Sequence, residues 1–171
     1  MIITSVQGNI TAQDDCDAIV NSANSSMLAG SGVCGVIHKA AGKELEQMTK
    51  HLAPLKPPNA VITQAFNLPN KYILHVCTPK FHIDLNPYAL LGDSLLNVFR
   101  LAEDNNIQRI ALPAIGTGIH SFPMPDAINI YSKIALSLRE TVLLKEIRFV
   151  FQSELDAKSM STRIQIDQQL I

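Results

Sequence analysis

The chain has 171 residues, of which 47% are hydrophobic and 17% charged, and this composition predicts one domain with a filled core and argues against disorder. Its formal net charge is −1, from 14 Lys and Arg against 15 Asp and Glu. Such a balance gives no general electrostatic reason to bind nucleic acid or an anionic membrane surface, so neither is expected as a main partner.

Predicted strands and helices alternate along the chain. Apolar runs favour strands at 1–7, 17–24, 60–66, 72–79, 109–115 and 146–152. Amphipathic patterns favour helices at 32–52, 86–106 and 125–141, and a C-terminal helix or tail at 156–171. In the helix at 86–106, Asn86 is expected as the N-cap and Pro87 as the first helical residue. Strands that alternate with helices predict a three-layer α/β domain.

Cysteines and histidines are too scattered to predict a disulfide or a metal site. Cys16, Cys34 and Cys77 are odd in number and form no CxxC pair, which favours reduced thiols. A zinc site needs about four clustered ligands, so no metal is expected. The sequence has neither a run of about 18 apolar residues nor a signal-peptide pattern at its start. We therefore expect a cytoplasmic protein without a membrane partner.

Two glycine-rich segments each follow a predicted strand, one at 30–35 and the other at 116–118. Ligands of α/β sheets bind where the chain leaves the carboxyl ends of the strands. Glycine lets the backbone approach a ligand closely, and exposed N–H groups near a helix N-terminus suit a phosphate without any net positive charge. Two such loops on one sheet edge would clamp a diphosphate. Each loop alone is also typical of a plain turn, and neither matches the dinucleotide or P-loop glycine patterns.

Three segments of the chain resemble the signatures of the macro domain family: QGNIT at 7–11, the segment at 17–45, and LPAIGTGIHSFP at 112–123. Their order and spacing match from Met1 to about Leu155, so the chain 1–171 is interpreted as a single macro domain. The resemblance implies a three-layer α/β/α fold with a mixed central sheet. It also implies a cleft for ADP-ribose as ligand, with no cofactor. Many members hydrolyse derivatives linked at the distal ribose, whereas others only bind.

The resemblance assigns parts of this ligand to residues. Asn9 and Ile10 would lie at the adenine end of the cleft. The family usually has Asp at position 9, where it accepts a hydrogen bond from the adenine amino group. Asn keeps an acceptor oxygen but loses the charge that strengthens this hydrogen bond. Phe151 resembles the aromatic on which adenine stacks, and a plain core role is the open alternative. Asn24 resembles the Asn that holds the distal ribose hydroxyls, whereas Asn21 is expected to tie the loop backbone together. The diphosphate would contact Gly30, Ser31, Gly32, Val33, Ile115, Gly116, Thr117, Gly118 and Ile119.

Cys34 departs from the family pattern, because hydrolases of the family commonly carry an Asp there that is thought to orient or activate water. A thiol is a weaker general base, and three interpretations stay open. In the first, the substrate's own phosphate positions the water, as in viral members with Ala at this place. In the second, Cys34 is a nucleophile near a helix N-terminus. In the third, the site binds without turnover. If Cys34 is not a nucleophile, its side chain only fills space under the distal ribose.

His120 also departs from the pattern, since the family commonly has an aromatic there. It would line the distal ribose, act as an acid or base near neutral pH, or lie in a solvated loop.

The resemblance therefore implies a protein that binds ADP-ribose and removes it from mono-ADP-ribosylated acidic side chains, or deacetylates O-acetyl-ADP-ribose. Asn24 is the main catalytic candidate, with Cys34 and His120 as further candidates. The alternative is a non-catalytic reader of ADP-ribosylated proteins. Expected partners are ADP-ribose or ADP-ribosylated proteins, and the expected oligomeric state is a monomer.

Overall fold

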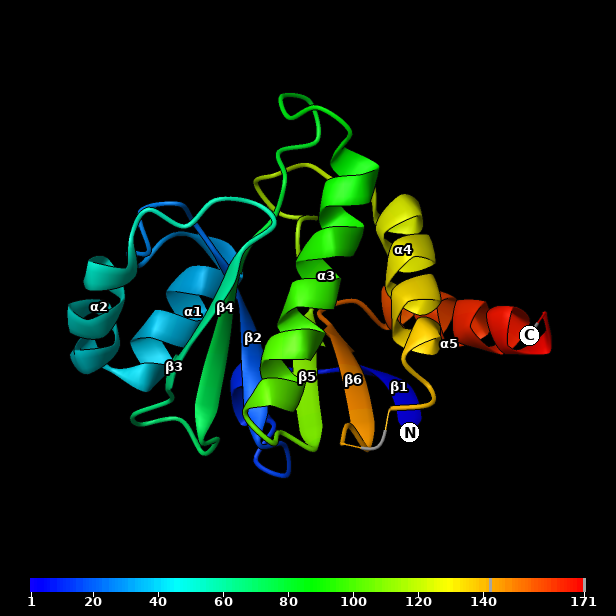
Figure 1. Cartoon of the computed structure of the whole chain (residues 1–171), viewed down its shortest axis with the longest axis horizontal. Coiled ribbons are helices and arrows are strands. Elements are labelled where there is room, and N and C mark those ends of the chain that lie inside the picture. Colours follow the sequence, from blue (N-terminus) through cyan, green and yellow to red (C-terminus); the bar gives the residue numbers. More distant parts are fainter. Residues whose placement is uncertain (142, 171) are drawn as a thin grey trace.

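The computed structural model describes residues 1–141 and 143–170 and contains one six-stranded sheet in the order β1-β6-β5-β2-β4-β3 (Figure 1). Neighbouring strands are parallel except for β3, which runs antiparallel to β4. The sheet is therefore mixed, as expected. The strands are β1 (Ile2–Gln7), β2 (Ala18–Ala23), β3 (Ala60–Gln64), β4 (Tyr72–Cys77), β5 (Arg109–Pro113) and β6 (Glu146–Phe151).

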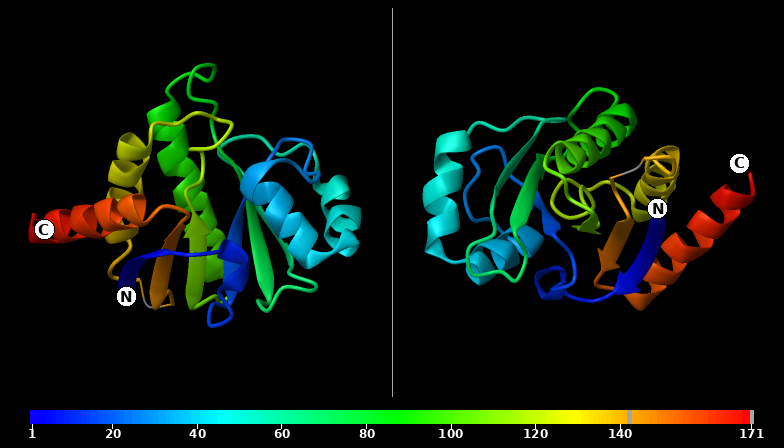
Figure 2. Two further views of the ribbon diagram at one scale, coloured as in Figure 1. Left: turned by 180° about the vertical axis from the view of Figure 1, so that it is seen from behind. Right: turned by 60° about the horizontal axis from the view of Figure 1, so that its bottom comes forward.

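Helices cover both faces of the sheet. The helices α3 (Pro87–Asp104) and α4 (Met124–Ser137) lie on one face, while α1 (Gly32–Ala41) and α2 (Lys43–Thr49) lie on the opposite face (Figures 1 and 2). The C-terminal α5 (Glu154–Gln169) packs against α4 and the edge strand β1. This arrangement confirms the predicted three-layer α/β/α fold.

Alternating residues of the central strand β2 build the two separate cores. Val20 belongs to the cluster under α3 and α4, whereas its neighbour Ile19 belongs to the cluster under α1 and α2. Both side chains are fully buried. A strand covered on both faces shows a continuous apolar run instead of an alternating one, which is the pattern that the sequence has here.

One helix boundary differs from that predicted, and one N-cap lacks its expected side-chain bond. The helix expected at 32–52 is divided at Gly42, whose φ of 95° lies in the left-handed region and ends α1. A Cβ at this position would lie 2.7 Å from the end of the Asn67 side chain, and the positive φ would strain any other residue, so both features favour glycine. Asn86 precedes α3 but makes no side-chain capping bond, because its own backbone is left-handed with φ 51°. Asn86 is thus the N-cap residue by position, as predicted, although its side chain does not cap the helix, and Pro87 begins the helix as expected.

The remaining elements are short or lie at the C-terminal end. Single 3₁₀ turns at Ile10–Ala12 (η1) and Lys50–Leu52 (η2) follow β1 and α2. The tail forms one continuous helix, α5, whose N-cap Ser153 accepts a hydrogen bond from the Asp156 N–H. Across residues 1–141 and 143–170, no helix has the length and apolar character needed to cross a membrane.

Candidate ligand-binding site

A cavity of about 490 Å³ lies at the carboxyl ends of β2, β5 and β6. Its first wall is the connection from β2 to α1, its second is the loop after β5, and its third is the end of β6 with the start of α5. Because β5 lies between β2 and β6 in the sheet, the loop after β5 stands between the other two walls. The cavity therefore has two ends, one at α1 and the other at α5.

Most of the predicted site residues meet in this cavity. Those on its lining are Asn24, Gly30, Ser31, Gly32, Val33, Cys34, Gly116, Thr117, Gly118, Ile119, His120 and Phe151. Three predicted residues, Asn9, Ile10 and Ile115, do not line the cavity. The side chain of Ile10 is buried in the core under α1, and the side chain of Ile115 is buried in the core under α3 and α4.

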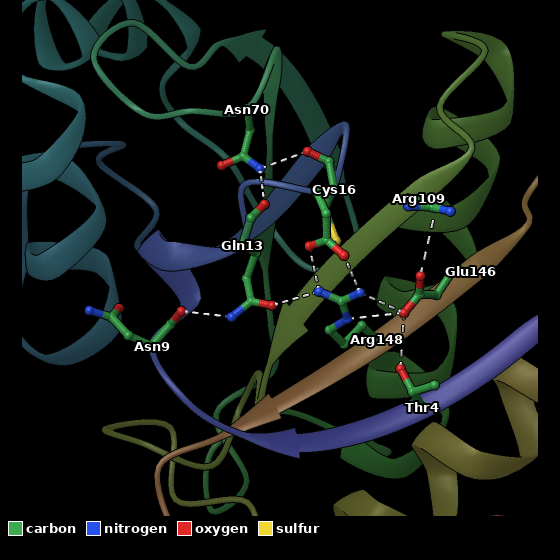
Figure 3. Close-up of polar contacts among 9 residues, drawn as sticks. Thr4, Asn9, Gln13, Cys16, Asn70, Arg109, Glu146 and Arg148 are labelled. Atoms are coloured by element: carbon green, nitrogen blue, oxygen red, sulfur yellow. Dashed lines mark hydrogen bonds and ion pairs between the residues drawn. The ribbon is translucent and has the colours of Figure 1, made fainter.

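Asn9 serves the structure of its own loop. Its side-chain Oδ1 accepts hydrogen bonds from the backbone N–H of Thr11 (3.0 Å) and from the Thr11 hydroxyl (2.9 Å). Its carbonyl accepts a bond from Gln13, which in turn accepts one from Arg148 on β6 (Figure 3). The oxygen that was expected to bind adenine thus also accepts two hydrogen bonds from Thr11, and its contact with adenine stays a prediction.

The β2–α1 connection turns tightly enough to place the start of α1 against the cavity. A Cβ on Gly35 would lie 2.2 Å from the carbonyl oxygen of Gly30, so this close approach of helix and loop requires glycine. Gly32 has φ 59° in the left-handed region, directly after the N-cap residue Ser31. The first N–H groups of a helix have no partners within it, and the helix dipole adds positive potential there. This wall therefore offers N–H donors to an anion.

The loop after β5 presents further donors from the facing wall. Gly116 adopts φ 86°, and its carbonyl accepts a bond from the Phe122 N–H (3.0 Å). Within the described part of the chain, the backbone N–H groups of Gly116, Gly118 and Ile119 make no hydrogen bond. Around Gly118, no atom lies within 4 Å of the position of a Cβ. The loop is thus open toward the cavity and has unsatisfied donors.

No Lys or Arg lies among the described lining residues, so the cavity would bind an anion through backbone N–H groups and the dipole of α1. This agrees with the near-zero net charge of the chain.

Asn24 lines the α1 end of the cavity and also holds its own loop. Its Oδ1 accepts bonds from the Ser26 hydroxyl (2.7 Å) and the Leu28 N–H (3.3 Å), and its Nδ2 donates to the Leu28 carbonyl (2.8 Å). An amide nitrogen has two N–H groups, so one remains for a ligand.

Cys34 is almost fully buried and makes polar contacts with the protein. Its sulfur lies 3.6 Å from the Leu28 carbonyl, as a thiol donor, and 3.8 Å from Asn21 Nδ2. Asn21 Nδ2 also lies 3.1 Å from Nδ1 of His75, a ring held neutral because burial lowers the pKa of His75 to about 3. Asn21 therefore ties Cys34 to a buried histidine, not loop backbone as expected. A thiol used as a donor to a carbonyl argues against a nucleophilic Cys34.

His120 lies at the end of the loop after β5, where its Nδ1 is 2.9 Å from the Thr78 hydroxyl. Partial burial lowers the pKa of His120, and the charge of Lys80 lowers it further. The imidazole is therefore neutral at neutral pH, which makes it a proton acceptor rather than an acid. The structure places it half-buried on the lining of the cavity.

The α5 end contains residues that the sequence analysis missed. Phe151 lines the cavity and is almost fully buried in the core, so the core role is observed, and stacking on a base stays a prediction. Gln152, Ser153 and Asp156 complete this end. The sequence signal for them was a capping pattern, Ser153 followed by Asp156, directly after the last predicted strand.

Tyr131 supports the loop after β5 from below, since its buried hydroxyl donates to the carbonyl of Ile115. Tyr131→Phe is expected to lower the free energy of unfolding by about 1–2 kcal/mol, because a buried carbonyl loses its partner. Urea denaturation measures this as a lower midpoint at unchanged slope. Tyr88→Phe is the matched control: it removes an exposed hydroxyl that donates to Asp126, and a change of about 0.5 kcal/mol or less is expected. Equal effects of the two variants would contradict the supporting role of Tyr131.

Comparison with known proteins identifies relatives of this chain. A family model described as "Macro domain" matches residues 20–131. A protein of Escherichia fergusonii named O-acetyl-ADP-ribose deacetylase is 39% identical over 155 residues, which cover 87% of either chain. The macrodomain of Oceanobacillus iheyensis, solved with ADP, superimposes with a TM-score of 0.92 at 29% identity and covers 99% of this chain and 92% of that one. The Trypanosoma brucei macrodomain in complex with ADP-ribose superimposes with a TM-score of 0.86 at 26% identity, and the match covers 94% of this chain and 68% of that one.

Proposed function

Because this chain belongs to the macro domain family, we propose that it binds ADP-ribose and hydrolyses esters of its distal ribose. The substrates would be mono-ADP-ribosylated acidic side chains or O-acetyl-ADP-ribose. The observation that carries the proposal is the pair of facing loops, which supply N–H donors from both sides of one cavity without a cationic side chain. Relatives with these names support it: one is called an O-acetyl-ADP-ribose deacetylase and another, from Xenopus laevis, an ADP-ribose glycohydrolase.

The topology of the cavity suggests how the ligand would lie. The diphosphate would bind between the β2–α1 connection and the loop after β5, where the N–H donors face each other. The distal ribose would reach Asn24 and Cys34 at the α1 end, and adenosine would reach Phe151 at the α5 end. The placement of the distal ribose and of adenosine at opposite ends follows from the sheet order β6-β5-β2. In this order, the loop after β5 lies between the α1 end and the α5 end of the cavity.

The chemistry would proceed by attack of a water molecule at the distal end. The α1 end of the described lining has no carboxylate, so a diphosphate oxygen and the free N–H of Asn24 would position the water. The N–H donors would stabilise charge that develops in the transition state. With an ADP-ribosylated acidic side chain, water that attacks C1 of the distal ribose expels a carboxylate, a weak base that needs little help from a general acid. With O-acetyl-ADP-ribose, water attacks the acetyl carbon and the leaving group is the ribose alkoxide, which has to take up the proton that the attacking water loses. The absence of an acidic side chain at this end is therefore compatible with turnover of the first substrate.

A non-catalytic reader is the second candidate function, favoured by the contacts of Cys34. Its thiol is already hydrogen-bonded to the protein, and a thiol replaces the carboxylate that hydrolases of the family commonly carry. The two functions differ in turnover. In one assay, a protein that carries ADP-ribose on glutamate is incubated with the chain, and released ADP-ribose is measured over time. In a second assay, O-acetyl-ADP-ribose is the substrate, and released acetate is measured. Release proportional to enzyme supports hydrolysis; tight binding without release establishes the reader.

ADP-ribose is expected to bind with a Kd of about 1 μM, equivalent to about −8 kcal/mol, as measured by isothermal titration calorimetry. AMP should bind about 100-fold more weakly, because it lacks the second phosphate and the distal ribose and so leaves one loop and Asn24 unused. ADP is the intermediate control, since it restores the second phosphate alone. Equal affinities for AMP and ADP-ribose would contradict the placement of the diphosphate between the two loops.

A further inference from the structure

Two aliphatic side chains stand in solvent on the loop between β4 and α3, which projects beyond α3 (Figure 1). Ile83 is 74% exposed and Leu85 is 90% exposed. Neither side chain packs into a hydrophobic cluster of the described residues. Large apolar side chains grouped at one place on a surface are typical of a site that binds another molecule.

The loop is held in one shape by its own contacts. The Asp84 carboxylate accepts a hydrogen bond from the Lys80 N–H (2.7 Å), and the Lys80 carbonyl accepts bonds from the N–H groups of Ile83 (3.1 Å) and Asp84 (2.9 Å). The ring of Phe81 packs edge-on against the ring of Phe122, with centroids 5.0 Å apart. A surface that is ordered before binding loses little conformational entropy when a partner covers it.

The same loop adjoins the α1 end of the cavity. Strand β4 flanks β2 on the side away from β5, and its last residue, Cys77, pairs with Ala23 on the cavity lining. The Phe81 N–H donates to the carbonyl of His120 (2.9 Å), another lining residue. Ile119, beside His120, lines the cavity and is 78% exposed, so it lies where the cavity opens to solvent. The loop after β4 therefore lies beside the mouth of the cavity.

The proposed ligand determines what would lie outside this mouth. In its placement, the distal ribose lies at the α1 end, and a modified protein is attached through C1 of that ribose. A cavity of about 490 Å³ has room for a ligand and not for a polypeptide, so the attached chain would pass over the rim at this end. Residues next to the modified side chain would then reach the exposed side chains of the loop.

We propose that Ile83 and Leu85, beside Ile119 at the mouth, form a docking surface for the polypeptide that carries the ADP-ribose. The surface fits an apolar side chain next to the modified acidic residue. This inference rests on the proposed function, because it requires ADP-ribose to bind with its distal ribose at the α1 end. Of the two proposed substrates, only the modified protein would use the surface, since an acetyl group does not extend beyond the mouth.

The test uses two peptides that carry ADP-ribose on a glutamine-derived side chain, through an amide that resists hydrolysis. One peptide has leucine on both sides of the modified residue and the other has serine there, and calorimetry with the full chain gives both dissociation constants. The leucine peptide is expected to bind about tenfold more tightly, as partial burial of one leucine side chain predicts.

In the double variant Ile83→Ser with Leu85→Ser, this ratio should fall to within about threefold, because the apolar contact is lost. The dissociation constant of free ADP-ribose should stay unchanged, since neither residue lines the cavity. Leu155→Ser with Leu170→Ser is the matched control. These side chains lie at the two ends of α5, are 74% and 78% exposed, and are absent from the lining, so the ratio should equal that of the unmodified chain. Thermal unfolding should give unchanged midpoints for both double variants, because all four side chains are exposed.

The outcomes separate this inference from the proposed function. If ADP-ribose does not bind the unmodified chain, the proposed function fails and the inference fails with it. If ADP-ribose binds but the leucine peptide gains no advantage, the inference alone is overturned. A full ratio in the loop variant, or an equal fall in the control variant, would also overturn it.

Two further results would assign the loop another role. Weaker binding of free ADP-ribose by the loop variant would show that the loop shapes the cavity, which contradicts docking. Analytical ultracentrifugation checks for a second copy of the chain as the occupant. A dimer of the unmodified chain that the loop variant abolishes would overturn the inference.

Discussion

Gly118→Glu is expected to abolish ADP-ribose binding while leaving the fold intact. No atom lies within 4 Å of a Cβ at this position, and the backbone is not in the left-handed region, so a side chain fits without strain. The new side chain would enter the proposed path of the diphosphate with a negative charge. Repulsion and lost N–H contacts together predict a loss of about 1,000-fold in affinity, equivalent to about 4 kcal/mol.

Calorimetric titration measures the affinity, and thermal unfolding shows whether the variant remains folded. Gly118→Gln is the matched control, since it has nearly the same size without the charge and should lose less affinity. Gly116→Glu is a poorer test of the same loop. Its φ of 86° and a Cβ 3.4 Å from the Leu91 side chain would strain the backbone as well as block the ligand. Binding retained in a folded Gly118→Glu variant would show that this loop is only a turn.

Asn24→Ala is expected to reduce turnover of either proposed substrate by about 100-fold. The change removes the N–H that would position the distal ribose and water, and small displacements at a reacting centre are costly. It also removes the bonds that Asn24 makes to Ser26 and Leu28, so loop disorder has to be separated from lost anchoring.

Ser26→Ala separates these effects. It removes the hydroxyl that donates to Asn24 Oδ1 at 2.7 Å, but Ser26 is exposed and is not on the cavity lining. Its kcat/KM should stay within a few-fold of the unmodified chain. An equal loss in Ser26→Ala and Asn24→Ala would assign the effect to the loop. Unchanged turnover in Asn24→Ala would overturn the placement of the distal ribose.

Cys34→Ala is expected to leave turnover within a few-fold, in contrast to Asn24→Ala. If a diphosphate oxygen positions the water, the thiol contributes only packing and its bonds to Leu28 and Asn21. A nucleophilic thiolate would instead make the same change remove activity, at a cost of several kcal/mol in the barrier. Cys34→Asp, measured beside it, should raise turnover or create it in a reader, because it restores the carboxylate common in the family.

Local sequence patterns were sufficient to predict the elements and both loops of the cavity. Each strand of the sheet coincides with a predicted apolar run, and the glycines at 30–35 and 116–118 lie where those strands end. These features depend on neighbours in the chain: hydrophobic periodicity, glycine, and proline at the start of a helix. Single-residue backbone conformations were less predictable. Gly42 ends α1 with a left-handed φ of 95°, and Asn86 precedes α3 with a left-handed φ of 51° and no side-chain capping bond.

The composition of the cavity's ends depended on the tertiary structure. Sheet order places β6 beside β5 and β5 beside β2, so Asp156, near the C-terminus, joins Asn24 in one cavity although their separation in sequence gave no sign of it. Asn9 lies near the start of the chain, and its side chain is engaged by Thr11 while its carbonyl accepts from Gln13, which contacts Arg148 on β6. The sequence determined which residue types were available. Packing of distant strands decided which residues meet at the cavity, whereas the contact to the Asn9 side chain is local, because Thr11 lies only two residues further along the chain.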